Sequence, residues 1–150
     1  MATIHTLPVP PDSLLAAFGD ERDYRDCFAR DEPGAVSLAR FLERFYRSLA
    51  FTPERAILRL IGSPASRATA SALAHGEAER FAVWKVVYRR DNEILMESRE
   101  TGTASWFKVE QRGNATRLYF GSWVGNFDQS GWKALEGAHV WYSKFLLNGV

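Results

Sequence analysis

Residues 80–124, RFAVWKVVYRRDNEILMESRETGTASWFKVEQRGNATRLYFGSWV, contain four segments rich in aromatic and β-branched residues. These segments are Arg80–Arg90, Glu93–Glu100, Ala104–Gln111 and Ala115–Val124. The residues between them, Asp91-Asn92, Thr101-Gly102-Thr103 and Gly113-Asn114, tolerate tight reversals and predict three successive β-hairpins. Because parallel strands need connections of a dozen or more residues, the predicted sheet is antiparallel.

A helical pattern follows the last strand, from Trp132 to about Leu147. Apolar side chains occupy much of its circumference, so most of this helix should be covered. The predicted fold class is α+β. A curved antiparallel sheet grips a long C-terminal helix, and two shorter helices follow the first strand.

The first half of the chain supplies the remaining elements. Residues 1–22 contain three prolines and predict an extended N-terminal arm, and residues 23–150 predict a single domain that begins with a strand at Asp23–Arg30. Apolar residues at helical spacing predict a helix over 36–49, and Thr52-Pro53-Glu54 predicts the start of another over 53–61. Residues 65–79 could be a loop or a weak helix.

Composition excludes several classes of function. The 150 residues include 19 Lys and Arg against 18 Asp and Glu, a formal charge of +1, which gives no long-range attraction for nucleic acid. Cys27 is the single cysteine, and the three histidines lack metal-ligand spacing, so no disulfide and no metal site is expected. No cofactor-binding fingerprint, secretion signal or membrane-spanning run is present, which predicts a cytoplasmic protein without a cofactor.

The order of strand, two helices, strands and final helix resembles the START-like superfamily, also called SRPBCC or helix-grip. Asp23-Tyr24-Arg25-Asp26-Cys27-Phe28 and Ala138-His139-Val140-Trp141-Tyr142-Ser143 resemble segments of an uncharacterised bacterial branch of that superfamily. The resemblance implies a hydrophobic cavity between the sheet and the final helix, which holds lipids, sterols, polyketides or plant hormones. Some members of the superfamily act as cyclases or dehydratases.

Alternation along the strands sorts side chains onto two faces and predicts which of them line a pocket. The face expected to meet the helices carries Trp84, Tyr88, Glu97, Arg99, Phe107, Phe120 and Ser122, and His139 and Tyr142 would approach it from the final helix. Glu97 and Arg99 could form a structural ion pair. Alternatively, they could face a cavity, where the arginine would hold an acidic or carbonyl group. His139 could likewise be structural or an acid or base.

Three functions remain open from the sequence. The first is binding of a small lipophilic molecule with one polar end in the cavity. The second is a cyclase-like or dehydratase-like enzyme that uses acid and base residues in the same cavity. The third is an interaction protein that forms a homodimer through Trp106, Tyr119 and Trp123, which the alternation places on the outer face of the sheet.

Overall fold

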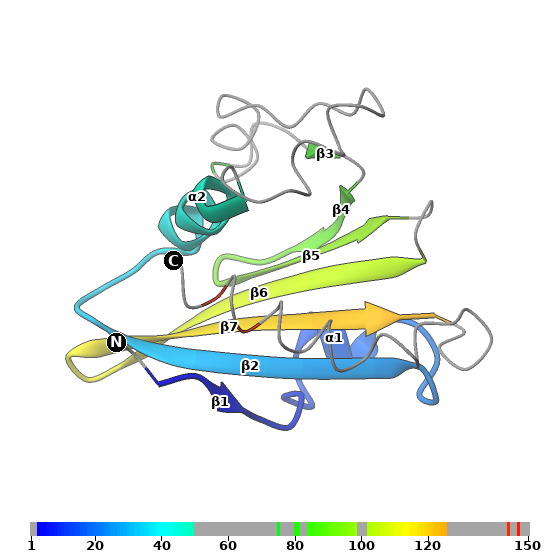
Figure 1. The fold of residues 1–150 in the computed structure, drawn as a ribbon, viewed down its shortest axis with the longest axis horizontal. Helices are drawn as coiled ribbons and strands as arrows, with labels where there is room; N and C mark the ends of the chain where they lie inside the picture. The colour runs from blue at the N-terminus through cyan, green and yellow to red at the C-terminus, as the bar shows by residue number, and fades with distance from the viewer. Residues whose placement is uncertain are drawn as a thin grey trace.

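The computed structural model of the chain describes residues 3–49, 75, 80–81, 84–98, 102–125, 144 and 147. The chain order of its elements is β1 (His5–Thr6), α1 (Leu14–Ala17), β2 (Tyr24–Pro33), α2 (Leu38–Leu49), β3 (Arg80–Phe81), β4 (Trp84–Arg89), β5 (Glu93–Ser98), β6 (Thr103–Arg112) and β7 (Ala115–Val124). The strands form one seven-stranded sheet in the order β1-β2-β7-β6-β5-β4-β3 (Figure 1). All neighbouring strands are antiparallel, as the short turns predict.

Helix α2 covers one face of the sheet. Its apolar residues recur every three or four positions, and the side chain of Ser37 accepts a hydrogen bond from the Arg40 amide at 3.2 Å near the start of the helix. The buried stripe consists of Leu38, Phe41, Leu42 and Phe45. It packs on the aromatic and aliphatic side chains that β2, β5, β6 and β7 direct to the same side, which forms the larger of two cores. We call this side of the sheet the α2 face.

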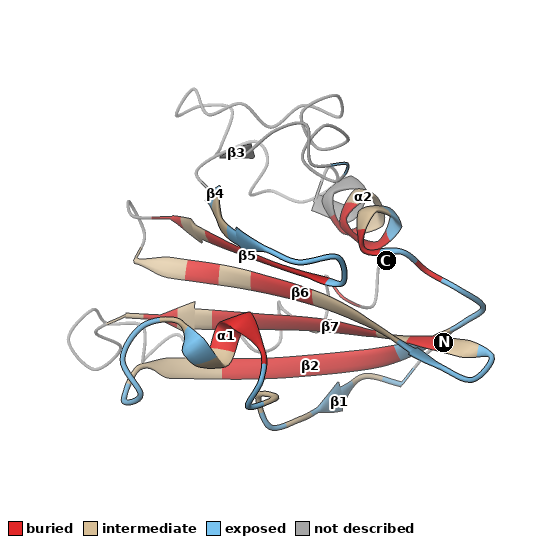
Figure 2. Cartoon of the chain, turned by 180° about the vertical axis from the view of Figure 1, so that it is seen from behind, coloured by how far each residue is buried: buried red, intermediate tan, exposed pale blue. Residues whose placement is uncertain are grey.

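Helix α1 packs against the opposite face, over β2, β7, β6 and β5, and is seen in front of the sheet in Figure 2. Leu14 and Leu15 meet Cys27, Leu95, Trp106 and Tyr119 in a second core, with Leu7, Val9 and Phe18 at its margin. Gly121 allows this close approach, because a Cβ there would lie 2.6 Å from Leu15 Cδ2 and 2.9 Å from Trp106 Cε3. The sheet is therefore covered on both sides along β2 and β7, where Figure 2 shows buried residues in red.

Polar contacts fasten α1 and the turn after it. Ser13 caps the helix by accepting a hydrogen bond from the Ala16 amide at 3.1 Å. The Arg25 guanidinium on β2 donates to the carbonyl oxygens of Leu15, Phe18, Asp20 and Asp23. These carbonyl oxygens lie in the last turn of α1 and beyond it, where backbone acceptors lose their helical partners. The partly buried Arg25 side chain thus holds the segment in which the chain returns from α1 to β2.

The register agrees with the prediction in the last hairpin and departs from it in β5. Gly113 and Asn114 form a two-residue turn, so Arg112 pairs with Ala115, and Phe107 pairs with Phe120 on the α2 face. In the preceding hairpin Ser98 pairs with Thr103, so the connection has four residues and not three. One extra residue exchanges the two faces of the strand. Met96 therefore lies on the α2 face, whereas Glu97 lies on the α1 side.

A bulge in β4 makes a second departure from strict alternation. Val86 pairs with Met96 and Tyr88 pairs with Leu95, with the register shift between them at Val87. Val86 therefore packs with the α2 core, while Tyr88 is on the other side and is 57% exposed. The prediction that Tyr88 shares a face with Phe107 and Ser122 is therefore wrong.

The predicted helix-grip architecture is wrong. The described residues form a seven-stranded sheet with two helices, α2 of 12 residues and α1 of 4, and they contain no long C-terminal helix. Phe107 and Phe120 on the α2 face pack instead on Phe41 and Phe45 of α2. Of the helix predicted over 132–147, Lys144 and Leu147 are described and are helical, and the remainder lies outside the described residues. The predicted helix over 53–61 also lies outside them.

Candidate functional site

Three polar residues line up across the α2 face. Ser105 of β6 pairs with Ser122 of β7, and Ser122 pairs with Asp26 of β2. Paired residues on neighbouring antiparallel strands direct their side chains to the same side, about 5 Å apart. We call Ser105, Ser122 and Asp26 the serine–aspartate row.

Asp26 is held firmly although it carries a carboxylate. The residue is 9% exposed. Its Oδ1 accepts a hydrogen bond from the Ser122 amide at 2.9 Å, and its Oδ2 accepts one from the Tyr24 hydroxyl at 2.9 Å. Hydrogen bonds to a charged acceptor are the stronger kind, and a buried carboxylate needs them to offset the loss of water. The carboxylate is thereby fixed next to Ser122.

The two serine hydroxyls of the row differ from the Asp26 carboxylate in their hydrogen bonding. Ser122 is 4% exposed and Ser105 is partly buried. Within the part of the chain that the structure describes, neither hydroxyl has a hydrogen-bond partner; the amide of Ser122, not its Oγ, binds Asp26. The row therefore offers two hydroxyl groups that a bound molecule could satisfy.

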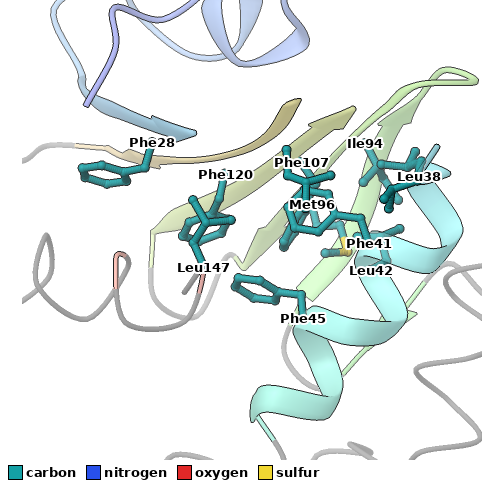
Figure 3. Packing of buried hydrophobic residues seen from close by; sticks show 12 residues of the cluster. Phe28, Leu38, Phe41, Leu42, Phe45, Ile94, Met96, Phe107, Phe120 and Leu147 are labelled. Carbon is teal, nitrogen blue, oxygen red and sulfur yellow. The ribbon is translucent and has the colours of Figure 1, made fainter. Parts of the chain in front are cut away.

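An aromatic row lies directly beside the serine–aspartate row. Two positions further along their strands, roughly 6.6 Å away, come Phe107, Phe120 and Phe28, aligned with one another and with Ile94. The Phe107 and Phe120 rings are 5.2 Å apart, and the Phe45 ring of α2 lies 4.8 and 4.9 Å from them (Figure 3). The Lys144 Nζ lies 5.5 Å from the centre of the Phe28 ring. The α2 face thus changes from polar to aromatic within one step along the strands.

The structure brings together three of the residues predicted to form the pocket. Phe107, Phe120 and Ser122 share the α2 face and are 1%, 5% and 4% exposed. Tyr88 and Glu97 lie on the other side of the sheet, so the predicted convergence of Glu97 with Phe107 is wrong. Trp84 pairs with Phe81 at the β3–β4 edge. Arg99, His139 and Tyr142 lie outside the described residues.

Asp26 is the residue that sequence reasoning missed. The segment Asp23–Arg30 was expected to be a strand, and its alternate positions Tyr24, Asp26, Phe28 and Arg30 already mark one face. This strand pairs with the last strand, which brings Asp26 beside Ser122. No short turn in the sequence indicates this pairing, because the two residues are 96 positions apart. The carboxylate of the site therefore comes from the first half of the chain.

The carboxylate on the α1 side has a structural role. Glu93 is 2% exposed, and its Oε2 accepts hydrogen bonds from the Leu14 amide at 3.1 Å and from the Trp106 indole at 2.8 Å. Its Oε1 accepts one from Arg90 at 2.8 Å. These partners satisfy the carboxylate and join α1 to the sheet.

Two other kinds of site are not found in the described residues. No three His, Cys, Asp or Glu side chains among them are grouped so that they could hold a metal ion. None of the described helices has the length and apolar character that crossing a membrane requires. No family model, curated protein or solved structure matches this chain.

Proposed function

We propose that this protein binds a small lipophilic molecule with one polar end on the α2 face of its sheet. The observation that carries the proposal is the position of Ser122, a polar residue that is 4% exposed and lies beside the aromatic row on the α2 face. It lies between the Asp26 carboxylate and the Ser105 hydroxyl. Ligand sites typically combine apolar walls with a few polar groups that fix orientation, and the aromatic row beside Ser122 supplies such walls.

The geometry gives less support to the other two functions. An enzyme that uses Glu97 on the same face as Phe107 and Ser122 is not supported, because the register places Glu97 on the opposite side. The surface expected to form a dimer is covered within the chain. Trp106 is 0% and Tyr119 is 5% exposed beneath α1 and the arm.

The experiment is native mass spectrometry of the purified protein before and after denaturation, combined with titration of an apolar fluorescent probe. A bound small molecule that is released on denaturation, or saturable probe binding, is the expected result. Ser105→Val adds apolar bulk to the polar row while remaining compatible with a strand, so it should abolish either signal. The control is Ala115→Val. Ala115 lies on the opposite face at the start of β7, so this variant should leave both signals unchanged.

Absence of both a co-purified molecule and saturable probe binding in the unaltered protein would contradict the proposal. Equal binding by the Ser105→Val variant and the unaltered protein would also contradict it, because the site would then lie elsewhere. Circular dichroism confirms that each variant is folded before the comparison is made.

A further inference from the structure

We infer that the polar end of the bound molecule is a carboxylate, and that the ammonium group of Lys144 receives it beside the Phe28 ring. This inference rests on the proposed function and specifies the chemistry of the same site. It follows from the position of Lys144 and from the groups that surround it.

Lys144 places a positive charge beside the aromatic row. Its Nζ lies 5.5 Å from the centre of the Phe28 ring, and Phe28 is the member of the row on β2, where it pairs with Phe120 (Figure 3). Phe28 is 1% exposed, whereas Lys144 is only partly buried. The charge therefore lies at the margin of the apolar wall, where the polar end of a molecule with an apolar body would come.

The Phe28 ring satisfies this ammonium group only in part. An aromatic face attracts a cation, but it does not neutralise the charge or offer oxygen acceptors to the three N–H groups. Among the described residues, no carboxylate forms an ion pair with the Lys144 Nζ and no oxygen accepts a hydrogen bond from it. A carboxylate on the bound molecule would supply both the negative charge and the acceptors, and charge-assisted hydrogen bonds are the stronger kind.

The two carboxylates that β2 directs to the α2 face, Asp26 and Glu32, are bound by other groups. Glu32 forms ion pairs with two arginines. Asp26 accepts a hydrogen bond from a main-chain amide of β7, which holds its carboxylate against the sheet. Within the described part of the chain, Lys144 is thus a cation of this face to which no carboxylate is assigned.

Ser122 lies diagonally across from Phe28 on the neighbouring strand. Phe28 pairs with Phe120, and Ser122 is two positions further along β7. Diagonal neighbours on one face are about 7–8 Å apart, within reach of a long side chain. A serine hydroxyl can donate a hydrogen bond. A carboxylate that contacts Lys144 can therefore accept a second hydrogen bond from Ser122, while the apolar body of the molecule lies along the aromatic row.

Lys108 provides a comparison on the opposite face of the sheet. It is also partly buried, and its Nζ lies 5.9 Å from the centre of the Tyr119 ring. Glu110 is close enough to feel its charge. A hydrogen bond from Arg112 lowers the pKa of the Glu110 carboxyl, and the charge of Lys108 lowers that pKa further. Lys108 thus has an acidic neighbour in its own chain, unlike Lys144 among the described residues.

The test uses two probes that share one ring system and differ at the polar end, 2-naphthoate and 2-naphthalenemethanol. The first is an anion at neutral pH and the second is an uncharged alcohol. Their affinities for the purified protein are measured by fluorescence titration. We expect the acid to bind about tenfold or more tightly than the alcohol, the scale of one hydrogen bond to a charged group.

Three variants assign the preference to Lys144. Lys144→Met removes the charge but keeps a long apolar side chain, so it should weaken the acid about tenfold and change the alcohol by less than about twofold. Lys144→Arg keeps the charge and should bind the acid more tightly than Lys144→Met does. Lys108→Met is the matched control, because it makes the same change over an aromatic ring on the opposite face, and both affinities should be unchanged. Circular dichroism confirms that each variant is folded.

The outcomes separate this inference from the function on which it rests. If neither probe binds and no molecule co-purifies, the proposed function itself fails. If both probes bind but the acid is no tighter than the alcohol, the site stands and the inference about its polar end is overturned. A preference for the acid that persists in Lys144→Met, or that Lys108→Met removes equally, would also overturn it. So would a co-purified molecule that has no acidic group.

Discussion

At the scale of single residues, the surroundings of Cys27 determine the pKa of its buried thiol. The side chain is 1% exposed in the core beneath α1. Burial, and secondly the negative charge of the adjacent Asp26, raise the pKa of the Cys27 thiol from 9.0 to about 12. The thiol is therefore protonated and inert in the folded protein, whereas reactivity belongs to the thiolate.

This pKa shift predicts how stability changes in alkali. In the unfolded chain the thiol loses its proton near its ordinary pKa of 9.0, but in the folded chain only near 12. The contribution of Cys27 is thus complete below about pH 9 and is lost as the pH rises towards about 12. Replacing Cys27 with Ala should remove that part of the decline in the free energy of unfolding, measured by urea denaturation across this range.

A parallel pH dependence of the unaltered protein and Cys27→Ala would contradict this prediction. Labelling with iodoacetamide gives an independent check on the same residue. The native protein should react slowly at neutral pH and the denatured protein rapidly; fast reaction of the native protein would show that the thiol is accessible.

At the scale of elements, Glu93 determines how firmly α1 is joined to the sheet. Replacing Glu93 with Met removes the acceptor of the Leu14 amide and of the Trp106 indole, and both donors are buried. We expect the free energy of unfolding to fall by about 2–4 kcal/mol, because donors without partners lose their hydration with no compensation. Urea denaturation measures this loss.

The matched control for Glu93 is Glu110→Gln. Glu110 also forms an ion pair with an arginine, Arg112, but its side chain is 37% exposed, so the change should be within about 0.5 kcal/mol. Glu93→Gln keeps an oxygen acceptor and should recover part of the stability lost in Glu93→Met. Equal losses in the Met variant and in the Glu110 control would show that the buried network contributes little.

Individual elements were predictable from the sequence, but the assignment of faces depended on single connecting residues. The turn at Gly113-Asn114 has two residues in both the prediction and the structure, so Phe107, Phe120 and Ser122 were correctly grouped. The connection before Thr103 has one residue more than predicted, which moved Glu97 to the other side. Apolar residues occur on both faces of β5, so the hydrophobic pattern could not correct the error.

The candidate site was predictable only in its local part. Ser122 and its aromatic neighbours follow from one hairpin, whereas Asp26 enters through a strand distant in sequence. Short-range patterns carry no information on such a pairing. The burial of the second face of the sheet was likewise not predictable from local patterns. Trp106 and Tyr119 were correctly placed away from Phe107, but α1 and the arm that cover them have little periodicity of their own.

At the scale of the whole molecule, the N-terminal arm acts as the cover of one sheet face. Removing residues 1–22 would take away α1 together with Leu7 and Val9, which pack around Trp106 and Tyr119. We expect the shortened protein to expose a large apolar patch and to associate as its concentration rises. Sedimentation velocity over a range of concentrations measures this change.

The unshortened 150-residue chain is the reference for this comparison, and dye binding provides a second measurement. The shortened protein should bind 8-anilinonaphthalene-1-sulfonate more strongly than the unshortened chain does. A shortened protein that stays folded, binds no more dye and sediments independently of concentration would mean that the arm is not needed to cover this face.

The pairing of β2 with β7 also bears on how quickly the molecule can assemble. These strands pair over ten residues each, yet Asp26 and Ser122 are separated by 96 positions. Contacts between distant segments require a long loop to close before any stabilisation is gained, and proteins rich in such contacts fold slowly. The hairpins from β4 to β7 need no such closure and can form early. We therefore expect β2 to dock onto β7 more slowly than these hairpins form, because this pairing requires the longer loop to close.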